Sequence, residues 1–287
     1  NPEINEAKNR NITLTSWQNF IGDYLNSLGK IGITVSGSEG KGTTAGILTT
    51  ILKGTNFDPL SILGAKIKKI YDDCDSNIYI GKGETYILEG DEFNRNFHSY
   101  HPSINIMVNF QYEHPETYKD FDLYQQAFYQ FFKGMNTPKT LILNATDTII
   151  NFVDKFRITD THKIIWYGKK EQLKFIDSGI DVYEINNVIV NPNGIKFELI
   201  RDNDKFEFQI NSLPEYLIYN GTGAIIAAFE LGLNYETIKN NLLSFIGMTR
   251  RFDLHKTRNG GVFITDYGHS PESLNHIIKE IRTIFNG

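Results

Sequence analysis

Short β-branched runs alternate with longer amphipathic segments along most of the chain. The runs have the length of buried strands, and the segments between them carry apolar residues at the spacing of a helix with one apolar face. Strands are predicted at 31–36, 85–89, 104–109, 140–143 and 163–167, and helices at 43–52 and 122–132. This strand–helix rhythm predicts an α/β fold with a mostly parallel sheet and flanking helices.

The pattern changes in the last third of the chain. Apolar and polar positions alternate over 196–210 around Asp202-Asn203-Asp204, which predicts an antiparallel hairpin at an edge of the sheet. A domain boundary is predicted near 247–250, and the start of a second α/β domain follows it. Helices are predicted at 216–231 and 235–245 before this boundary, and a strand at 262–265 and a helix at 271–284 after it.

Composition narrows the class of protein. With 287 residues, 40% hydrophobic and 22% charged, the chain has the make-up of one large or two modest globular domains. Its net charge of −5 gives no general attraction for nucleic acid. The single cysteine, Cys74, excludes an internal disulfide framework and a thiolate metal cluster, and it suits the cytoplasm. We find no apolar run of membrane-spanning length and no signal-peptide pattern, so we expect neither a nucleic-acid nor a membrane partner.

A glycine-rich loop follows the first predicted strand and opens a helix. Gly37, Gly40 and Lys41 lie in this turn, where backbone N–H groups and a helix N-terminus favour a polyphosphate. The generic phosphate-loop spacing is not met, because it requires glycine at Val35, and Gly42 stands where a magnesium-holding Ser or Thr is usual. The alternative is a glycine turn with a solvated lysine.

Two further strand ends carry candidate ligands. Glu89, Asp91 and Glu92 follow one predicted strand, and His114 follows another. Ligands gather at the carboxyl ends of parallel strands, and carboxylates suit Mg²⁺. Each feature has a plainer interpretation, a solvated acidic turn or a structural histidine, but both strand ends can converge on one phosphate loop.

Two late motifs also carry chemistry. Arg250 and Arg251 precede an aromatic residue and can grip phosphate, or they form a surface pair at the boundary. Asp266 and His269 lie between a predicted strand and a helix, where a site or ordinary capping is equally consistent.

In this order, the motifs resemble the Mur ligase family, in its muramate branch. The family patterns G-T-x-G-K-T-T, E-A-D-E, D-H-x-D-T-Y, H-N-x-x-N-A, R-R-F-D and D-D-Y-G-H-H-P-T-E are matched in whole or part at 37–43, 89–92, 113–118, 219–224, 250–253 and 265–272. The resemblance implies three parts: 1–30 as a linker from a UDP-sugar-binding domain outside this chain, 31–248 as the central ATP-binding domain, and 249–287 as the truncated beginning of the C-terminal ligase domain.

The resemblance also implies roles for single residues. Lys41 holds the β- and γ-phosphates, Arg251 touches the transferred phosphate, and Tyr267 and His269 lie near the acyl acceptor or amine. Lys41, Arg251 and His269 are the implied catalytic residues. Mg²⁺ is bound by Glu89 and His114, with Thr43 as a substitute for the residue at 42. The implied ATP-binding residues are Gly37, Ser38, Glu39, Gly40, Lys41, Gly42, Thr43, Asn220 beside the adenine, Arg251 and Asp266 on the ribose.

The activity implied is an ATP- and Mg²⁺-dependent amide ligase of peptidoglycan synthesis or recycling. A UDP-N-acetylmuramate-type carboxylate becomes an acyl phosphate, and an amino acid or peptide amine displaces the phosphate. Departures from the family pattern stand at Gly42, Tyr219, Gly223, Thr265 and Ser270. They leave two alternatives open: a folylpolyglutamate-type ligase, favoured by Lys41-Gly42-Thr43 but opposed by the intact R-R-F-D, and a nucleotide-binding relative without ligase activity.

Overall fold

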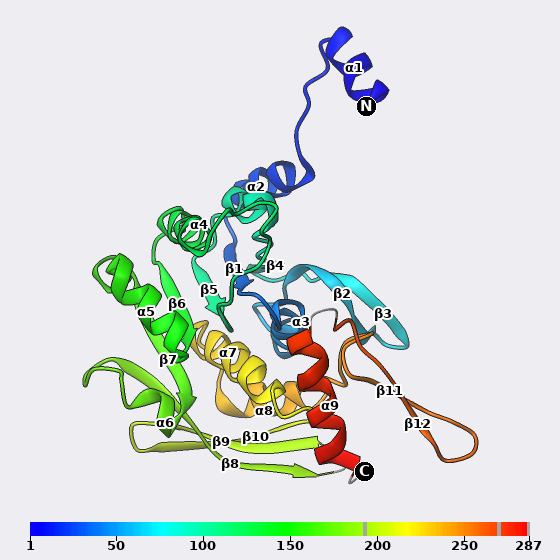
Figure 1. Cartoon of the computed structure of the whole chain (residues 1–287), viewed down its shortest axis with the longest axis vertical. Helices are drawn as coiled ribbons and strands as arrows, with labels where there is room; N and C mark the ends of the chain where they lie inside the picture. Colours follow the sequence, from blue (N-terminus) through cyan, green and yellow to red (C-terminus); the bar gives the residue numbers. More distant parts are fainter. Residues whose placement is uncertain (192–193, 269–270, 286–287) are drawn as a thin grey trace.

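One large twisted sheet organises the molecule. The computed structural model describes residues 1–191, 194–268 and 271–285, and its main sheet has 10 strands in the order β10-β9-β8-β7-β6-β5-β1-β4-β2-β3. A separate two-stranded sheet pairs β11 with β12 (Figure 1). The strands are β1 (Ile31–Ser36), β2 (Leu60–Tyr71), β3 (Cys74–Ile80), β4 (Thr85–Glu89), β5 (Ile104–Met107), β6 (Thr140–Asn144), β7 (Lys163–Lys169), β8 (Asp181–Asn191), β9 (Gly194–Arg201), β10 (Asp204–Ile210), β11 (Asp253–Lys256) and β12 (Val262–Thr265).

The centre of the sheet is parallel and its two edges are antiparallel. Strand β1 lies between β4 and β5, parallel to both, and the parallel pairing continues through β6, β7 and β8. Strand β3 pairs antiparallel at one edge, and β9 and β10 at the other. The predicted α/β fold and the hairpin over 196–210 are therefore confirmed. The hairpin is part of a larger antiparallel edge, because β8 also pairs with β9.

Helices cover both faces of the sheet. The predicted helices at 43–52 and 122–132 are present, each beginning slightly earlier than expected. Of the described residues, none forms a helix both long enough and apolar enough to cross a membrane. The α-helices are α1 (Pro2–Asn9), α2 (Trp17–Ser27), α3 (Lys41–Leu52), α4 (Phe121–Lys133), α5 (Asp147–Phe156), α6 (Lys170–Leu173), α7 (Leu217–Glu230), α8 (Tyr235–Leu242) and α9 (Pro271–Phe285); the 3₁₀ turns are η1 (Phe93–Ser99) and η2 (Ile158–Asp160).

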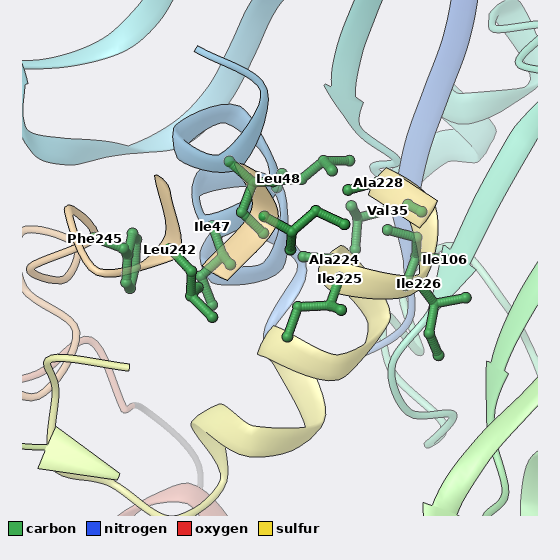
Figure 2. Close-up of a cluster of buried hydrophobic side chains, with 14 of the residues drawn as sticks. Val35, Ile47, Leu48, Ile106, Ala224, Ile225, Ile226, Ala228, Leu242 and Phe245 are labelled. Carbon is green, nitrogen blue, oxygen red and sulfur yellow. The ribbon is translucent and has the colours of Figure 1, made fainter. Parts of the chain in front are cut away.

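Two apolar cores lie on opposite faces of the sheet. On one face, α3, α7 and α8 pack together, and Figure 2 shows Leu48, Ala224 and Ile225 meeting between the first two of these helices. On the other face, α4 and α5 supply a cluster of aromatic side chains that includes Phe128 and Phe152. Every residue of α3 from Gly42 to Leu52 is buried. The helix that follows the glycine loop therefore lies inside the molecule rather than on its surface.

The N-terminal segment is different. Helix α1 has no buried residue and stands away from the rest of the chain (Figure 1). Helix α2 packs against η1 through Gly22 and Leu25, while Trp17, Phe20 and Tyr24 on its other side are exposed.

Candidate nucleotide site

The glycine loop is a tight turn between β1 and α3. Gly37 and Gly40 have φ values of +120° and +82°, a region that favours glycine. Space is also limited, because a Cβ at Gly37 would lie 2.6 Å from the carbonyl oxygen of Asn109, and one at Gly40 would lie 2.7 Å from Oδ1 of Asn220. The two glycines therefore allow the tight turn, and they also let Asn109 and Asn220 approach the loop closely.

Residues after β5 support the loop from one side. The Asn109 side chain accepts a hydrogen bond of 2.9 Å from the N–H of Glu39. The Ser38 hydroxyl donates to the carbonyl oxygen of Gln111 and accepts from its N–H, both at 2.8 Å. Because β5 is the parallel neighbour of β1, the segment 109–114 leaves the sheet beside the loop. The predicted convergence of this strand end with the loop is what the structure shows.

Lys41 is the first residue of α3, and its side chain folds back over the loop. Its ammonium donates to the carbonyl oxygens of Gly37 at 2.6 Å and Ser38 at 3.1 Å. It also lies 3.0 Å from a carboxylate oxygen of Glu92, a side chain with no solvent exposure. The backbone carbonyl of Glu92 accepts a hydrogen bond from the Tyr118 hydroxyl. Lys41 and Glu92 thus form a largely buried ion pair at the base of the loop.

Glu89 approaches the loop from the other side. It ends β4, the second parallel neighbour of β1, and its Oε2 accepts a hydrogen bond of 2.8 Å from the N–H of Gly64. A Cβ at Gly42 would lie 3.1 Å from the same oxygen. The carboxylate therefore stands at the first turn of α3, where the positive end of the helix dipole favours an anion and where a cation can bridge to phosphate.

The second acidic group gathers around His114. Ligand atoms of Glu92, Glu113 and His114 all lie within 4.8 Å of one another. The His114 Nε2 is 3.5 Å from Glu92, and its Nδ1 is 3.1 Å from Glu116. Burial raises the pKa of the Glu113 carboxyl, against a lowering effect of the Lys41 charge. Carboxylate oxygens and an imidazole nitrogen are a suitable donor set for Mg²⁺.

The predicted metal ligands are thus placed differently from one another. His114 lies with Glu92 and Glu113, and Glu89 is not a member of that group. Sequence reasoning named Glu92 among the candidate ligands after a strand but did not include it in the implied Mg²⁺ set, and it did not assign Glu113. The signal for Glu92 was its position directly after β4. Because β4 is a parallel neighbour of β1, the segment that follows β4 lies beside the loop that follows β1.

Asn220 and its neighbours on α7 border the loop from a third direction. Asn220 is buried with its side-chain amide against Gly40. Tyr219 is partly buried, and burial raises the pKa of its hydroxyl, with the Lys169 charge acting in the opposite direction. Lys169 in turn pairs with Glu215 at 2.9 Å. The structure therefore places Asn220 beside the loop, and its contact with the adenine stays a prediction.

The C-terminal motifs also reach this region. The Arg251 guanidinium stacks 4.9 Å from the centre of the Tyr267 ring. Asp266 accepts hydrogen bonds from the N–H of Phe252 at 2.6 Å and of Gly268 at 2.7 Å. A cavity of about 10 Å³ has Thr43 and Arg251 in its wall, so residues of the loop helix and of the R-R-F-D motif share one small space. His269, predicted at the substrate, and Ser270 lie outside the described residues.

The comparison with protein families decides how this site is classified. The model of the family described as "Mur ligase middle domain" matches residues 35–228, a segment that includes the loop, Glu89, His114 and Asn220. The chain belongs to the Mur ligase family.

Individual relatives agree with this. UDP-N-acetylmuramate–L-alanine ligase of Clostridium tetani is 31% identical over 275 residues, which are 96% of this chain and 57% of that protein. The ligase of the same name from Aquifex aeolicus is 29% identical over 289 residues, 99% of this chain and 59% of that protein. The chain therefore spans somewhat more than half the length of these curated relatives.

Solved structures show the same fold. UDP-N-acetylmuramate-alanine ligase MurC from Thermotoga maritima superimposes with a TM-score of 0.79 and 19% identity, covering 100% of this chain and 62% of that one. MurF ligase from Thermotoga maritima in complex with ADP has a TM-score of 0.71 and 17% identity, covering 94% of this chain and 62% of that one. Both comparisons support the α/β Mur ligase architecture of the sheet and its helices.

Packing explains one departure of this Mur ligase chain from the family pattern. A Cβ at Gly223 on α7 would lie 2.7 Å from the Ile106 side chain and 3.2 Å from the Tyr167 hydroxyl. The site therefore has no room for the family's second asparagine as the chain is packed. Tyr167 is fully buried, and its hydroxyl has no hydrogen-bond partner among the residues that the structure describes.

This arrangement predicts that Tyr167→Phe stabilises the protein. A buried hydroxyl without a partner costs roughly 1–3 kcal/mol, so its removal is expected to raise the free energy of unfolding by about 1 kcal/mol in urea denaturation. Tyr183→Phe is the matched control, because the Tyr183 hydroxyl accepts a hydrogen bond of 3.0 Å from Arg201, and that variant should lose stability. Equal losses in both variants would contradict the prediction.

The R-R-F-D motif of this Mur ligase chain is fixed by its aspartate. Asp253 is buried, pairs with Lys68 of β2, and accepts a hydrogen bond of 3.2 Å from the N–H of Arg250. Arg250 and Phe252 have φ values of +58° and +45°, which are costly for residues with side chains. The Asp253 contacts hold this strained turn, and they present Arg251 toward Tyr267.

Stability should therefore depend on the charge of Asp253. Burial pushes its pKa up, but the Lys68 hydrogen bond, the Arg250 N–H and the charges of Lys68 and His255 outweigh this and place the pKa below its ordinary value. A lowered pKa gives stability that is present above the unfolded-state pKa of about 3.9 and is lost as the pH falls through the folded-state pKa.

Asp253→Asn is thus expected to lower the free energy of unfolding by about 2 kcal/mol at pH 7 and by little near pH 2–3. Urea denaturation across this pH range measures the difference. The exposed Asp122→Asn is the control, since its pair with Lys155 lies at the surface. A loss that is the same at every pH would show that the charge of Asp253 is not involved.

Proposed function

We propose that this chain is the ATP-binding part of an amide ligase that acts on a UDP-N-acetylmuramate-type carboxylate in peptidoglycan synthesis or recycling. The observation that carries the proposal is the convergence of Lys41, Glu89 and Asn220 on one glycine loop in a Mur ligase domain. In the proposed division, 1–30 is a linker, 31–248 the ATP-binding domain and 249–287 the beginning of the ligase domain. ATP as a substrate and the single Cys74 favour the cytoplasm.

The residues of the chain take distinct parts in the proposed reaction. The loop N–H groups from Gly37 to Thr43 and the Lys41 ammonium hold phosphate oxygens, after Lys41 exchanges its loop carbonyl partners for the ligand. Arg251 contributes a second positive group to the transferred phosphate. Asp266 receives the ribose hydroxyls, and Tyr267 and His269 border the acyl acceptor.

Bound Mg²⁺ would neutralise the charge that the phosphate oxygens carry. Glu89 is the ligand proposed at the α3 side of the loop, and His114 with Glu92 and Glu113 the ligands at the β5 side. Thr43, the proposed substitute for the residue at 42, lines the small cavity that it shares with Arg251. Formation of the acyl phosphate, which releases ADP, requires that the substrate carboxylate is aligned with the γ-phosphate. Amine attack on the acyl carbon, which releases phosphate, requires that water is excluded.

Two measurements test the proposal. Titration calorimetry of ATP and ADP with and without Mg²⁺ tests the nucleotide site in this chain. Phosphate release in the complete protein, which must require both a UDP-muramate-type precursor and an amine, tests the ligase reaction. Turnover with folates in place of the wall precursor would overturn the substrate class, and ATP binding without amine-dependent phosphate release would leave a nucleotide-binding relative instead.

A further inference from the structure

Two glycines from different elements flank the Glu89 carboxylate. A Cβ at Gly42 of α3 would lie 3.1 Å from Oε2 of Glu89, and a Cβ at Gly64 of β2 would lie 3.0 Å from the same atom. At both positions the nearest atoms that a side chain would meet all belong to Glu89. The carboxylate thus lies in a slot that exists because both residues lack a side chain.

Backbone conformation does not explain these glycines. Neither Gly42 nor Gly64 has a positive φ, in contrast to Gly37 and Gly40 of the loop. Gly42 also stands in the first turn of a helix, where glycine is a poor helix former. Open space beside the Glu89 oxygen is the property that the two positions share.

Gly64 also binds the carboxylate. The parallel pairing of β2 with β4 ends at Ile62 and Leu88, so the N–H of Gly64 lies beyond the ladder and donates to Glu89 at 2.8 Å. Glu89 is the next residue after that last pair, at the end of β4. The slot therefore holds the carboxylate by one hydrogen bond, and a side chain at either glycine would crowd it.

We propose that Gly42 and Gly64 form a socket that positions the Glu89 carboxylate where the side chain of residue 42 would otherwise stand, so that the cation side of the loop is built on a carboxylate rather than a hydroxyl. This inference rests on the proposed nucleotide function. Both glycines act through Glu89 and are positioning residues. If residue 42 had only lost its hydroxyl because the site is no longer used, nothing would require a second glycine, Gly64, on β2.

A double-mutant cycle on stability tests the socket without nucleotide or metal. Gly42→Thr is expected to lower the melting temperature by about 3 °C or more, since each kcal/mol shifts it by about 2–4 °C in a chain of this size. In a Glu89→Ala background the same change should have little effect or raise the melting temperature. Gly221→Ala is the control, because a Cβ there meets Ile210 and not Glu89, so its effect should be equal in both backgrounds. Equal effects of Gly42→Thr in both backgrounds would overturn the socket.

Calorimetry with ADP tests its consequence for the cation. Gly42→Thr is expected to reduce the gain in ADP affinity that Mg²⁺ provides, measured as the ratio of the affinities with and without the metal, by about tenfold. Glu89→Asp shortens the acid and should restore part of this gain in the Gly42→Thr chain. If the unmutated site simply lacks a hydroxyl ligand, Gly42→Thr should bind Mg²⁺·ADP more tightly. That result would overturn the inference. Absence of ADP binding in the unmutated chain would sink the proposed function, while the stability cycle would still decide the socket.

Discussion

Lys41→Met is expected to lower the free energy of unfolding by about 3 kcal/mol or more, because it leaves Glu92 buried without its cation. Glu92 has no solvent exposure, so it must either stay charged in a poorly solvated place or take up a proton. His114 at 3.5 Å is the remaining group that can compensate it in part. Urea denaturation measures the loss, and Lys119→Met, an exposed lysine before α4, is the charge-matched control.

A second substitution separates the structural role of Lys41 from its proposed role in binding. Lys41→Met/Glu92→Gln removes both charges of the pair and should recover most of the lost stability. ATP affinity should nevertheless stay at least about 100-fold below that of the unmutated chain, because the phosphate ligand of the loop is still missing. If calorimetry showed that affinity returns together with stability, Lys41 would be a structural lysine and not a phosphate ligand.

Glu89→Gln is expected to remove most of the Mg²⁺ dependence of ATP binding. In the proposed site this carboxylate is the cation ligand on the α3 side of the loop, and an amide is a much weaker ligand for Mg²⁺. We expect ATP affinity in the presence of Mg²⁺ to fall by about tenfold or more, toward the value that the unmutated chain shows after chelation of the metal.

The control for this experiment lies at the other end of β4. Glu84→Gln makes the same change of charge just before the start of β4, at the opposite end from Glu89, and should leave the Mg²⁺ dependence intact. Glu89→Gln with an unchanged response to Mg²⁺ would move the cation to Glu92, Glu113 and His114 and leave Glu89 as a structural acid. Thermal melting of both variants shows whether a loss of binding comes from unfolding.

The parts of the fold that sequence reasoning predicted are those that local patterns determine. Strand β1, the loop and α3 follow each other without interruption, so a buried β-branched run, two glycines and an apolar helix were enough to predict them. The antiparallel pair β9–β10 was visible because Phe197, Leu199, Phe206 and Phe208 alternate around an acidic turn. Strands β2, β3 and β8 were missed, because their exposed polar positions break the apolar runs that mark a buried strand.

The contacts that shape the site depend on strand order, which local patterns do not contain. That Lys41 pairs with Glu92, and that Gly42 faces Glu89, follows from β4 lying directly beside β1. The fit of Gly223 against Tyr167 needs α7 to cross β5 and β7, which are far apart in sequence. In the sequence, Gly42 and Gly223 therefore looked like lost family side chains. In the structure, a larger side chain at either position would crowd its neighbours.

The burial of α3 has a consequence for amide hydrogen exchange. Because Ala45 to Leu52 all lie inside the molecule, beyond the first turn of the helix, their backbone amides can reach solvent only when the layers on both sides separate. We therefore expect these amides to exchange at the rate set by global unfolding, with no faster local opening. A ligand that closes on the loop at the start of this helix would then slow exchange throughout the core, so its binding could be followed at residues far from any phosphate.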